Sequence, residues 1–206
     1  MEKSSDKSLS DFTAALASAE PTPGGGGACA YAASMAAALG CMVCNLTIGK
    51  AKYAAVQDDV KALLEQLEAT RKYMISLIDE DAKAFQPLSK YMSLPKDDPK
   101  RREHMDSALR VACYIPTEVM YTCGETLGRL SELAEKGVKS AISDVGVAVE
   151  LCRAALCASQ QNIFINASLI EDEVFAMTLR RECELVREQY LPTADAALKK
   201  VAERIG

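Results

Sequence analysis

The sequence has only one histidine, and its 29 Asp and Glu residues outnumber its 24 Lys and Arg residues. The resulting net charge of -5 argues against nucleic acid as a partner, because that kind of binding depends mainly on basic side chains facing phosphates. The single histidine also leaves little for a metal site that needs imidazole ligands. Cys41 and Cys44 form a C-x-x-C pair, but no second pair follows at ligand spacing. We therefore expect neither a metal centre nor a nucleic-acid partner.

The sequence also has no strand-like alternation, no internal repeat and no low-complexity block. Apolar residues recur at helical spacing instead, and 206 residues with 49% hydrophobic content suit one domain with a sizeable core. We predict an all-α fold of about seven helices in a single domain, residues 1–206. Pro116 should kink or end one helix, and residues 171–190 and 193–205 should form two separate helices.

Charge is absent from residues 21–49, PTPGGGGACAYAASMAAALGCMVCNLTIG, although charged residues make up 26% of the chain. Its alanines favour helix and let neighbouring backbones come close, so we predict a buried Ala/Gly-rich helix at the centre of the fold. An uncharged run of this length is also a membrane-span candidate. Alanine supplies most of its apolarity, however, and no aromatic belt flanks it, so we expect no membrane association.

Four glycines, Gly24, Gly25, Gly26 and Gly27, lead into this predicted helix. Two interpretations are open. The free N–H groups at the start of the helix could bind an anionic or carbonyl-bearing ligand, or a tight turn could let the helix start dock on a neighbour. A nucleotide loop is excluded, because no Lys-Ser or Lys-Thr follows and no strand pattern precedes the glycines.

Four polar residues stand out in the predicted helices. Asp81 follows Ile78 by three residues and precedes Phe85 by four, and a carboxylate on a buried stripe needs either a structural partner or a chemical role. Asp144 stands in the first turn of a predicted helix, where the dipole favours it whatever its function. Asn162 and Asn166 share one helix face, and their amides can both donate and accept hydrogen bonds.

Several segments together resemble a known family. PTPGGGG, the small-residue helix and NLTIGKAKY are similar to the cyclodeaminase domain of formimidoyltransferase-cyclodeaminase and to free-standing bacterial proteins of the cyclodeaminase/cyclohydrolase family. DEDAKAF at residues 79–85, IPTE at 115–118, SDVGVA at 143–148 and QNIFINASLIED at 161–172 follow in the family's order. The resemblance covers most of the chain and implies an enzyme that acts on a substituted tetrahydrofolate.

Two reactions are compatible with that resemblance. A cyclodeaminase closes 5-formimidoyltetrahydrofolate to the 5,10-methenyl form and releases ammonia, whereas a cyclohydrolase opens the methenyl form with water to give 10-formyltetrahydrofolate. Either reaction needs a carboxylate to move a proton and steady positive charge, and neither needs a cofactor beyond the folate substrate. A protein of another class, a folate-binding or assembly protein without catalysis, is the remaining alternative.

The resemblance also implies roles for the residues singled out above. It implies a homodimer, which the many apolar helix faces favour as well. The sequence has eight cysteines and no signal-peptide pattern, so we expect the protein to work in the reducing cytoplasm. The implied roles are these: Gly24 to Gly27 border the folate, Asp81 is the acid/base, Lys50 assists it or binds a folate carboxylate, Asp144 is a second catalytic candidate, and Asn162 and Asn166 hold the pterin or the reacting nitrogens.

Overall fold

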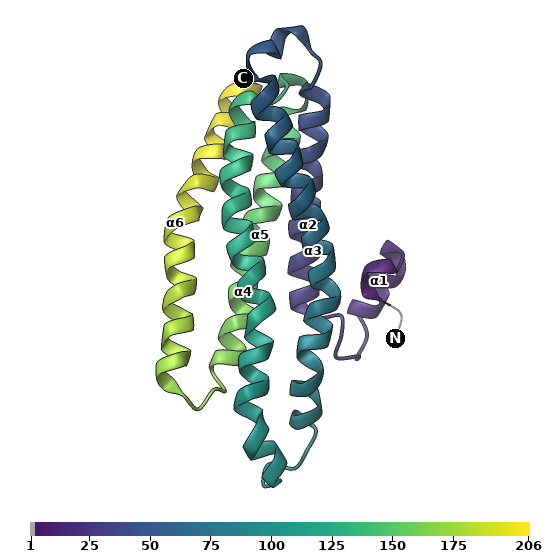
Figure 1. Ribbon diagram of the computed structural model, residues 1–206, viewed down its shortest axis with the longest axis vertical. Coiled ribbons are helices and arrows are strands. Elements are labelled where there is room, and N and C mark those ends of the chain that lie inside the picture. The colour runs from purple at the N-terminus through teal and green to yellow at the C-terminus, as the bar shows by residue number, and fades with distance from the viewer. Residues whose placement is uncertain (1–2) are drawn as a thin grey trace.

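Five long helices form an antiparallel bundle, and a short helix lies beside it near the N-terminus (Figure 1). The computed structural model describes residues 3–206. Within these residues no β-strand occurs, so the predicted all-α class is confirmed. The helices are α1 Leu9–Leu16, α2 Gly25–Thr47, α3 Gln57–Met92, α4 Pro99–Lys136, α5 Ile142–Ala167 and α6 Glu173–Ile205, with 3₁₀ turns at Ser4–Asp6, Ala51–Val56 and Lys139–Ala141.

Side chains that cap backbone N–H groups define three of the helix starts. The Ser8 side chain accepts from the Asp11 N–H at the start of α1. Asp98 caps α4 just before Pro99, and Asp172 caps α6. Such caps satisfy N–H groups that the first turn leaves without partners. The short polar residues before each hydrophobic run therefore fix where these helices begin.

Residues 3–206 form six α-helices where about seven were predicted, because two prolines do not separate helices. α4 continues through Pro116, and α6 runs through Pro192, so the predicted break between residues 190 and 193 is wrong. A proline inside a helix costs about 3 kcal/mol through one lost hydrogen bond and a steric clash. α4 packs against α2, α3, α5 and α6, and α6 packs against α4 and α5. This packing offsets the cost, and sequence spacing does not reveal it.

α2 packs against α3, α4 and α5, as its small residues predict. Ala30, Ala36 and Ala37 have no exposed surface, and a methyl group on Gly40 would lie 2.8 Å from Cδ1 of Leu67. By length and composition α2 is apolar enough to cross a membrane, but core helices meet the same criterion, and 61% of its apolar window is buried. The neighbours do not surround it completely, because Met35, Met42 and Leu46 remain exposed.

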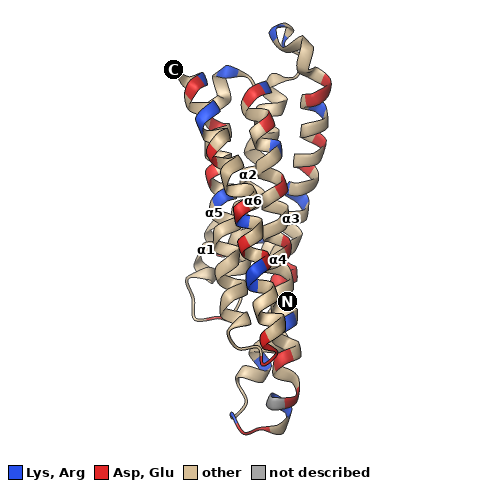
Figure 2. Cartoon of the chain, turned by 90° about the vertical axis from the view of Figure 1, so that its left-hand side faces the viewer, with Lys and Arg blue, Asp and Glu red and all other residues tan. Residues whose placement is uncertain are grey.

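The bundle brings four helix segments together at one end. The start of α2, the second half of α3, the middle of α4 and the end of α5 meet there, whereas the chain after α2 turns at the opposite end (Figure 1). Figure 2 shows that acidic and basic residues are interspersed along the helices. The N-terminal segment is tied to α3, because the Ser5 backbone N–H and hydroxyl both donate to the Asp79 carboxylate.

Candidate active site

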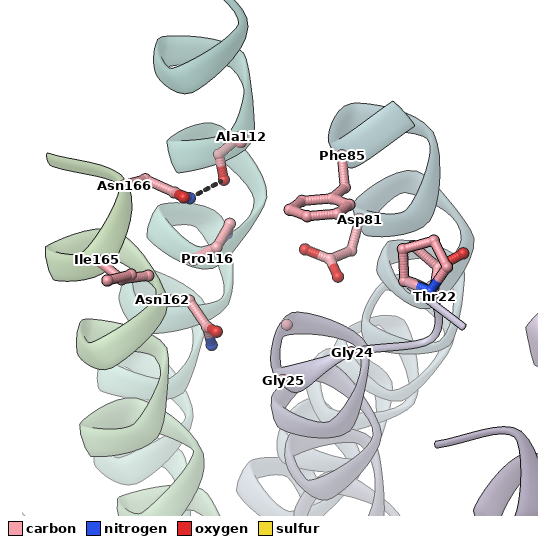
Figure 3. A pocket seen from close by; sticks show the side chains of 12 residues that line it. Thr22, Gly24, Gly25, Asp81, Phe85, Ala112, Pro116, Asn162, Ile165 and Asn166 are labelled. Atoms are coloured by element: carbon pink, nitrogen blue, oxygen red, sulfur yellow. Dashed lines mark hydrogen bonds between the residues drawn. The ribbon is translucent and has the colours of Figure 1, made fainter. Parts of the chain in front are cut away.

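A cavity of about 180 Å³ lies where the four helix segments meet. Asp81 and Phe85 reach it from α3, Asn162 and Asn166 from α5, and the first turn of α2 forms its floor (Figure 3). Sites for drug-sized ligands usually measure about 300–1,000 Å³. This cavity therefore accommodates the head group of a ligand, while the remainder of a longer molecule extends outside.

Asp81 lies directly against the backbone at the start of α2. The Gly27 N–H favours the charged form of its carboxylate, and a methyl group on Gly26 would overlap Oδ1. A Cβ on Gly27 would instead make an ordinary contact, 3.6 Å from Cγ2 of Ile78. The absence of a side chain at Gly26 is therefore what allows the carboxylate to approach this helix start.

Burial raises the pKa of Asp81 from its ordinary 3.8 to about 6, and the Gly27 N–H opposes that shift in part. Among the described residues no Lys or Arg influences its pKa. A buried carboxylate that serves as a structural ion pair would show the reverse, with a cation holding the pKa down. The structure thus favours a chemical role for Asp81, because its charge changes close to neutral pH and its oxygens face the cavity.

Asn162 stands opposite Asp81, on the other side of the glycine turn (Figure 3). A methyl group on Gly25 would lie 2.7 Å from Oδ1 of Asn162, and the Asn162 Nδ2 donates to Sγ of Cys29 at 3.8 Å. Gly25 and Gly26 therefore make room for two different polar side chains, one on each side. Gly24, Gly25 and Gly26 line the cavity, where the ligand-binding interpretation would place them, whereas Gly27 packs toward Ile78.

Asn166 lies one turn beyond Asn162 on α5. Its Nδ2 donates to the carbonyl oxygen of Ala112 at 3.3 Å, across to α4 (Figure 3). Both asparagines line the cavity, so the structure brings Asp81, Asn162 and Asn166 together with three of the four glycines. From the residues alone only the two asparagines were expected on one helix face; a common site with Asp81 and the glycines was what the resemblance implied.

The structure does not bring Lys50 or Asp144 into this group. Lys50 follows the end of α2, about 35 Å along that helix from Gly26 at 1.5 Å per residue. Asp144 lies in the first turn of α5, about 27 Å along it from Asn162. Within one chain, Lys50 is therefore too far away to assist Asp81, and Asp144 does not share its cavity; the alternative that Lys50 binds a folate carboxylate stays a prediction. The two residues belong to sequence segments near the glycines and asparagines, but each stands at the far end of its helix.

The C-x-x-C pair is buried inside the bundle. Burial raises the pKa of Cys41 to about 11 and that of Cys44 to about 12. Thiols with such values stay protonated at neutral pH, whereas redox and metal-binding cysteines react as thiolates. Within residues 3–206 no group of three or more His, Cys, Asp or Glu side chains is placed to hold a metal ion.

Sequence reasoning missed several parts of the site. Phe85 was assigned to the apolar stripe, but it stands beside Asp81 in the cavity, and Pro116 was treated only as a helix breaker. Spacing did place Phe85 one helical turn from Asp81, which was the available signal. In contrast, nothing in the sequence shows that Pro116 of α4 faces α5. The Asp81 carboxyl group can transfer one proton near neutral pH, and the amides of Asn162 and Asn166 can hold the polar edge of a ligand.

Comparisons with known proteins agree with the resemblance seen in the sequence. The model of a family described as formiminotransferase-cyclodeaminase matches residues 8–185. A methenyltetrahydrofolate cyclohydrolase from Methylorubrum extorquens is 39% identical over 183 residues, which cover 87% of this chain and 88% of that protein. A formimidoyltransferase-cyclodeaminase from Gallus gallus is 31% identical over 173 residues, 82% of this chain but only 32% of that protein.

A solved structure shares the fold over nearly the whole chain. The crystal structure of a formiminotetrahydrofolate cyclodeaminase from Thermotoga maritima superimposes with a TM-score of 0.89 and 29% sequence identity. The alignment covers 98% of both chains. The arrangement of helices around the cavity is therefore shared with that cyclodeaminase structure over nearly the whole of both chains.

Proposed function

Because this chain belongs to the formiminotransferase-cyclodeaminase family, we propose that it acts on the one-carbon unit that joins N5 and N10 of tetrahydrofolate. Of the two possible reactions we propose the cyclodeaminase reaction, in which 5-formimidoyltetrahydrofolate gives 5,10-methenyltetrahydrofolate and ammonia. The observation that carries the proposal is Asp81, a cavity carboxylate without a cationic partner among the described residues and with a pKa of about 6. Such a group can take and return a proton at neutral pH.

The reaction needs one proton to move between two nitrogens on the same carbon. The formimidoyl group enters in its protonated, amidinium form; N10 attacks its carbon and forms a C–N bond while the C=N π electrons move onto the exocyclic nitrogen, which becomes NH2. The Asp81 carboxylate then takes the proton from N10. The carboxylic acid then gives this proton to the exocyclic nitrogen, the bond from carbon to that nitrogen breaks, and ammonia leaves. The methenyl cation forms and Asp81 is again a carboxylate, so one acid/base group completes the cycle.

The other groups in the cavity suit the substrate's pterin end. Asn162 and Asn166 offer amide donors and acceptors for the polar edge of a pterin, and Phe85 and Ile165 supply apolar surface. The size of the cavity, about 180 Å³, fits binding of this head group with the aminobenzoyl-glutamate part outside. Partial exclusion of water also strengthens each polar contact that the carboxylate and the amides make.

The cyclohydrolase reaction is the second candidate, and the relative from Methylorubrum extorquens specifically favours it. That free-standing protein is similar over 88% of its length, whereas this chain spans about a third of the formimidoyltransferase-cyclodeaminases. In this reaction water adds to the methenyl carbon and Asp81 accepts a proton from it. Asp81 returns that proton to N5, the bond from carbon to N5 breaks, and the remaining hydroxyl loses its proton to solvent, which leaves 10-formyltetrahydrofolate.

Two spectrophotometric assays test the proposal. With 5-formimidoyltetrahydrofolate the wild-type protein should produce the near-ultraviolet absorbance of the methenyl form together with an equal amount of ammonia. With supplied methenyltetrahydrofolate, decay faster than the spontaneous rate would assign the cyclohydrolase reaction instead. Absence of both activities, with tetrahydrofolate still bound in a titration, would overturn the enzymatic proposal and leave a folate-binding protein.

We also propose that two copies of this chain pair through an apolar face on α2 and α5. The face consists of exposed or half-buried residues spaced alternately by four and three, the spacing of helix-packing seams. Because it has no charged member and adjoins the cavity at Ile165, a second identical face is a suitable partner. The residues of this α2–α5 face are Ala28, Ala32, Met35, Leu39, Met42, Leu46, Val147, Leu151, Ala154, Ala158, Gln161 and Ile165.

All eight cysteines are free thiols in the structure. This state suits a reducing compartment, and we propose that the protein works in the cytoplasm.

A further inference from the structure

One backbone carbonyl next to the cavity has lost its usual partner inside its own helix. In an α-helix the N–H of each residue donates to the carbonyl four residues earlier. Pro116 has no N–H, so it cannot donate to the carbonyl of Ala112. α4 nevertheless stays helical on both sides of Pro116, and Ala112 is only 5% exposed. A buried carbonyl without a donor would be costly.

The donor comes from another helix. Nδ2 of Asn166 on α5 donates to the Ala112 oxygen at 3.3 Å, so a side chain 54 residues away replaces the missing backbone N–H. Ala112, Pro116 and Asn166 all line the cavity (Figure 3). The exchange therefore takes place at the wall of the site and not in a remote part of the bundle.

This hydrogen bond also determines how the amide is oriented. A carbonyl oxygen can only accept, so the nitrogen of Asn166 must face Ala112 and the oxygen must point elsewhere. Asn162 has a weaker constraint, since its nitrogen contacts a sulfur at 3.8 Å. Of the two amides in the cavity, Asn166 is thus the one whose donor and acceptor ends are assigned by the protein itself.

We propose that Pro116 is a positioning residue for substrate binding, because it frees the Ala112 carbonyl that holds Asn166 with its Oδ1 available to an N–H group of the substrate. The inference builds on the proposed folate reaction, in which the pterin edge supplies such N–H donors. In this arrangement the helix gives up one internal bond, and the site gains an acceptor of fixed direction. Pre-ordering the amide reduces the entropy lost when the substrate binds.

Replacing Pro116 with alanine tests this arrangement. The new N–H competes for the Ala112 carbonyl and releases the Asn166 amide, so KM should rise about 5- to 10-fold, with a smaller change in kcat and no loss in Tm. Pro192→Ala is the matched control: Pro192 is also inside a helix, α6, and does not line the cavity. That variant should leave KM unchanged.

A double-mutant cycle separates positioning from simple contact, because Pro116 also touches the cavity. If Pro116 acts through Asn166, then Pro116→Ala should raise KM no further in an Asn166→Ala background. Additive effects would show that the proline ring contacts the substrate directly, and the proposal would be wrong. An unchanged KM in the single Pro116→Ala variant would overturn it as well.

One measurement needs no substrate and keeps the inference distinct from the proposed reaction. In protein labelled with ¹⁵N-asparagine, the side-chain amide signal that Asn166→Ala removes should shift in Pro116→Ala and stay in place in Pro192→Ala. An unmoved signal would refute the positioning role even in an active enzyme. Conversely, a shifted signal in a protein that turns over neither folate would leave the positioning of Asn166 standing and refute only the reaction.

Discussion

Asp81→Asn should make the protein more stable while it removes most of the activity. Burial raises the pKa of Asp81 from 3.8 to about 6, so between these values the folded protein binds more protons than the unfolded chain does. The free energy of unfolding therefore falls as the pH rises through this window, and the loss persists above it. A neutral amide has the shape of the acid form and avoids the loss.

The size of the gain follows from the shift. About two pH units at about 1.4 kcal/mol each set a ceiling near 3 kcal/mol. The carboxylate faces a cavity open to water, so screening reduces the expected gain to about 1–2 kcal/mol. For a chain of this size that corresponds to a Tm increase of about 2–8 °C above pH 7. Below about pH 3 the two proteins should melt together, because Asp81 is then protonated in both the folded and the unfolded state.

Turnover of the same preparations gives the second half of the test. Losing a positioned acid/base should lower kcat by about 10²–10⁴-fold. If Asp81 were a structural ion, the amide would instead destabilise the fold by about 3–5 kcal/mol. A lower Tm at pH 7.5, or normal turnover by the folded variant, would refute the reasoning from burial and leave the proton transfer to another group.

Three further outcomes are expected. In the wild type, kcat/KM should fall about tenfold per pH unit below about pH 6 as Asp81 gains its proton, and a flat profile there would exclude it as the base. Gly26→Ala should displace the Asp81 carboxylate and lower kcat/KM about 10²-fold. Gly27→Ala should keep its activity and raise the free energy of unfolding by about 0.5–1 kcal/mol. Equal activities of the two variants in rate assays would contradict the role given to Gly26. Met42→Glu on the α2–α5 face should raise the dimer dissociation constant at least about tenfold in light scattering, while Val174→Glu on the exposed side of α6 should not; monomeric wild type at micromolar concentration would refute the dimer.

The sequence predicted the parts of the site that follow from local periodicity. Asp81 interrupts an apolar stripe, and in the structure that position faces a cavity beside the glycines. Asn162 and Asn166 lie four residues apart on α5, and both reach the same cavity. In each case a helix of 3.6 residues per turn is enough to say which side chains share a face.

The parts that failed depend on how helices are placed relative to one another. Lys50 and Asp144 lie near site residues in the sequence. In the structure, however, they lie at the other ends of the long helices α2 and α5, at the opposite end of the bundle. The sequence also could not predict that α6 continues through Pro192. Tertiary packing contributes more to the stability of a long helix than the intrinsic helix propensity of its residues does.

The floor of the cavity is made of backbone atoms, because Gly25 and Gly26 present no side chains there. Evolution and protein engineering act by exchanging side chains, so this surface offers them almost nothing to vary. Side chains in the cavity walls, such as Phe85, Asn162 and Ile165, must therefore determine any preference for ammonia release over water addition. A library confined to those walls would search the part of the site where one reaction can be converted into the other while the shared floor is retained.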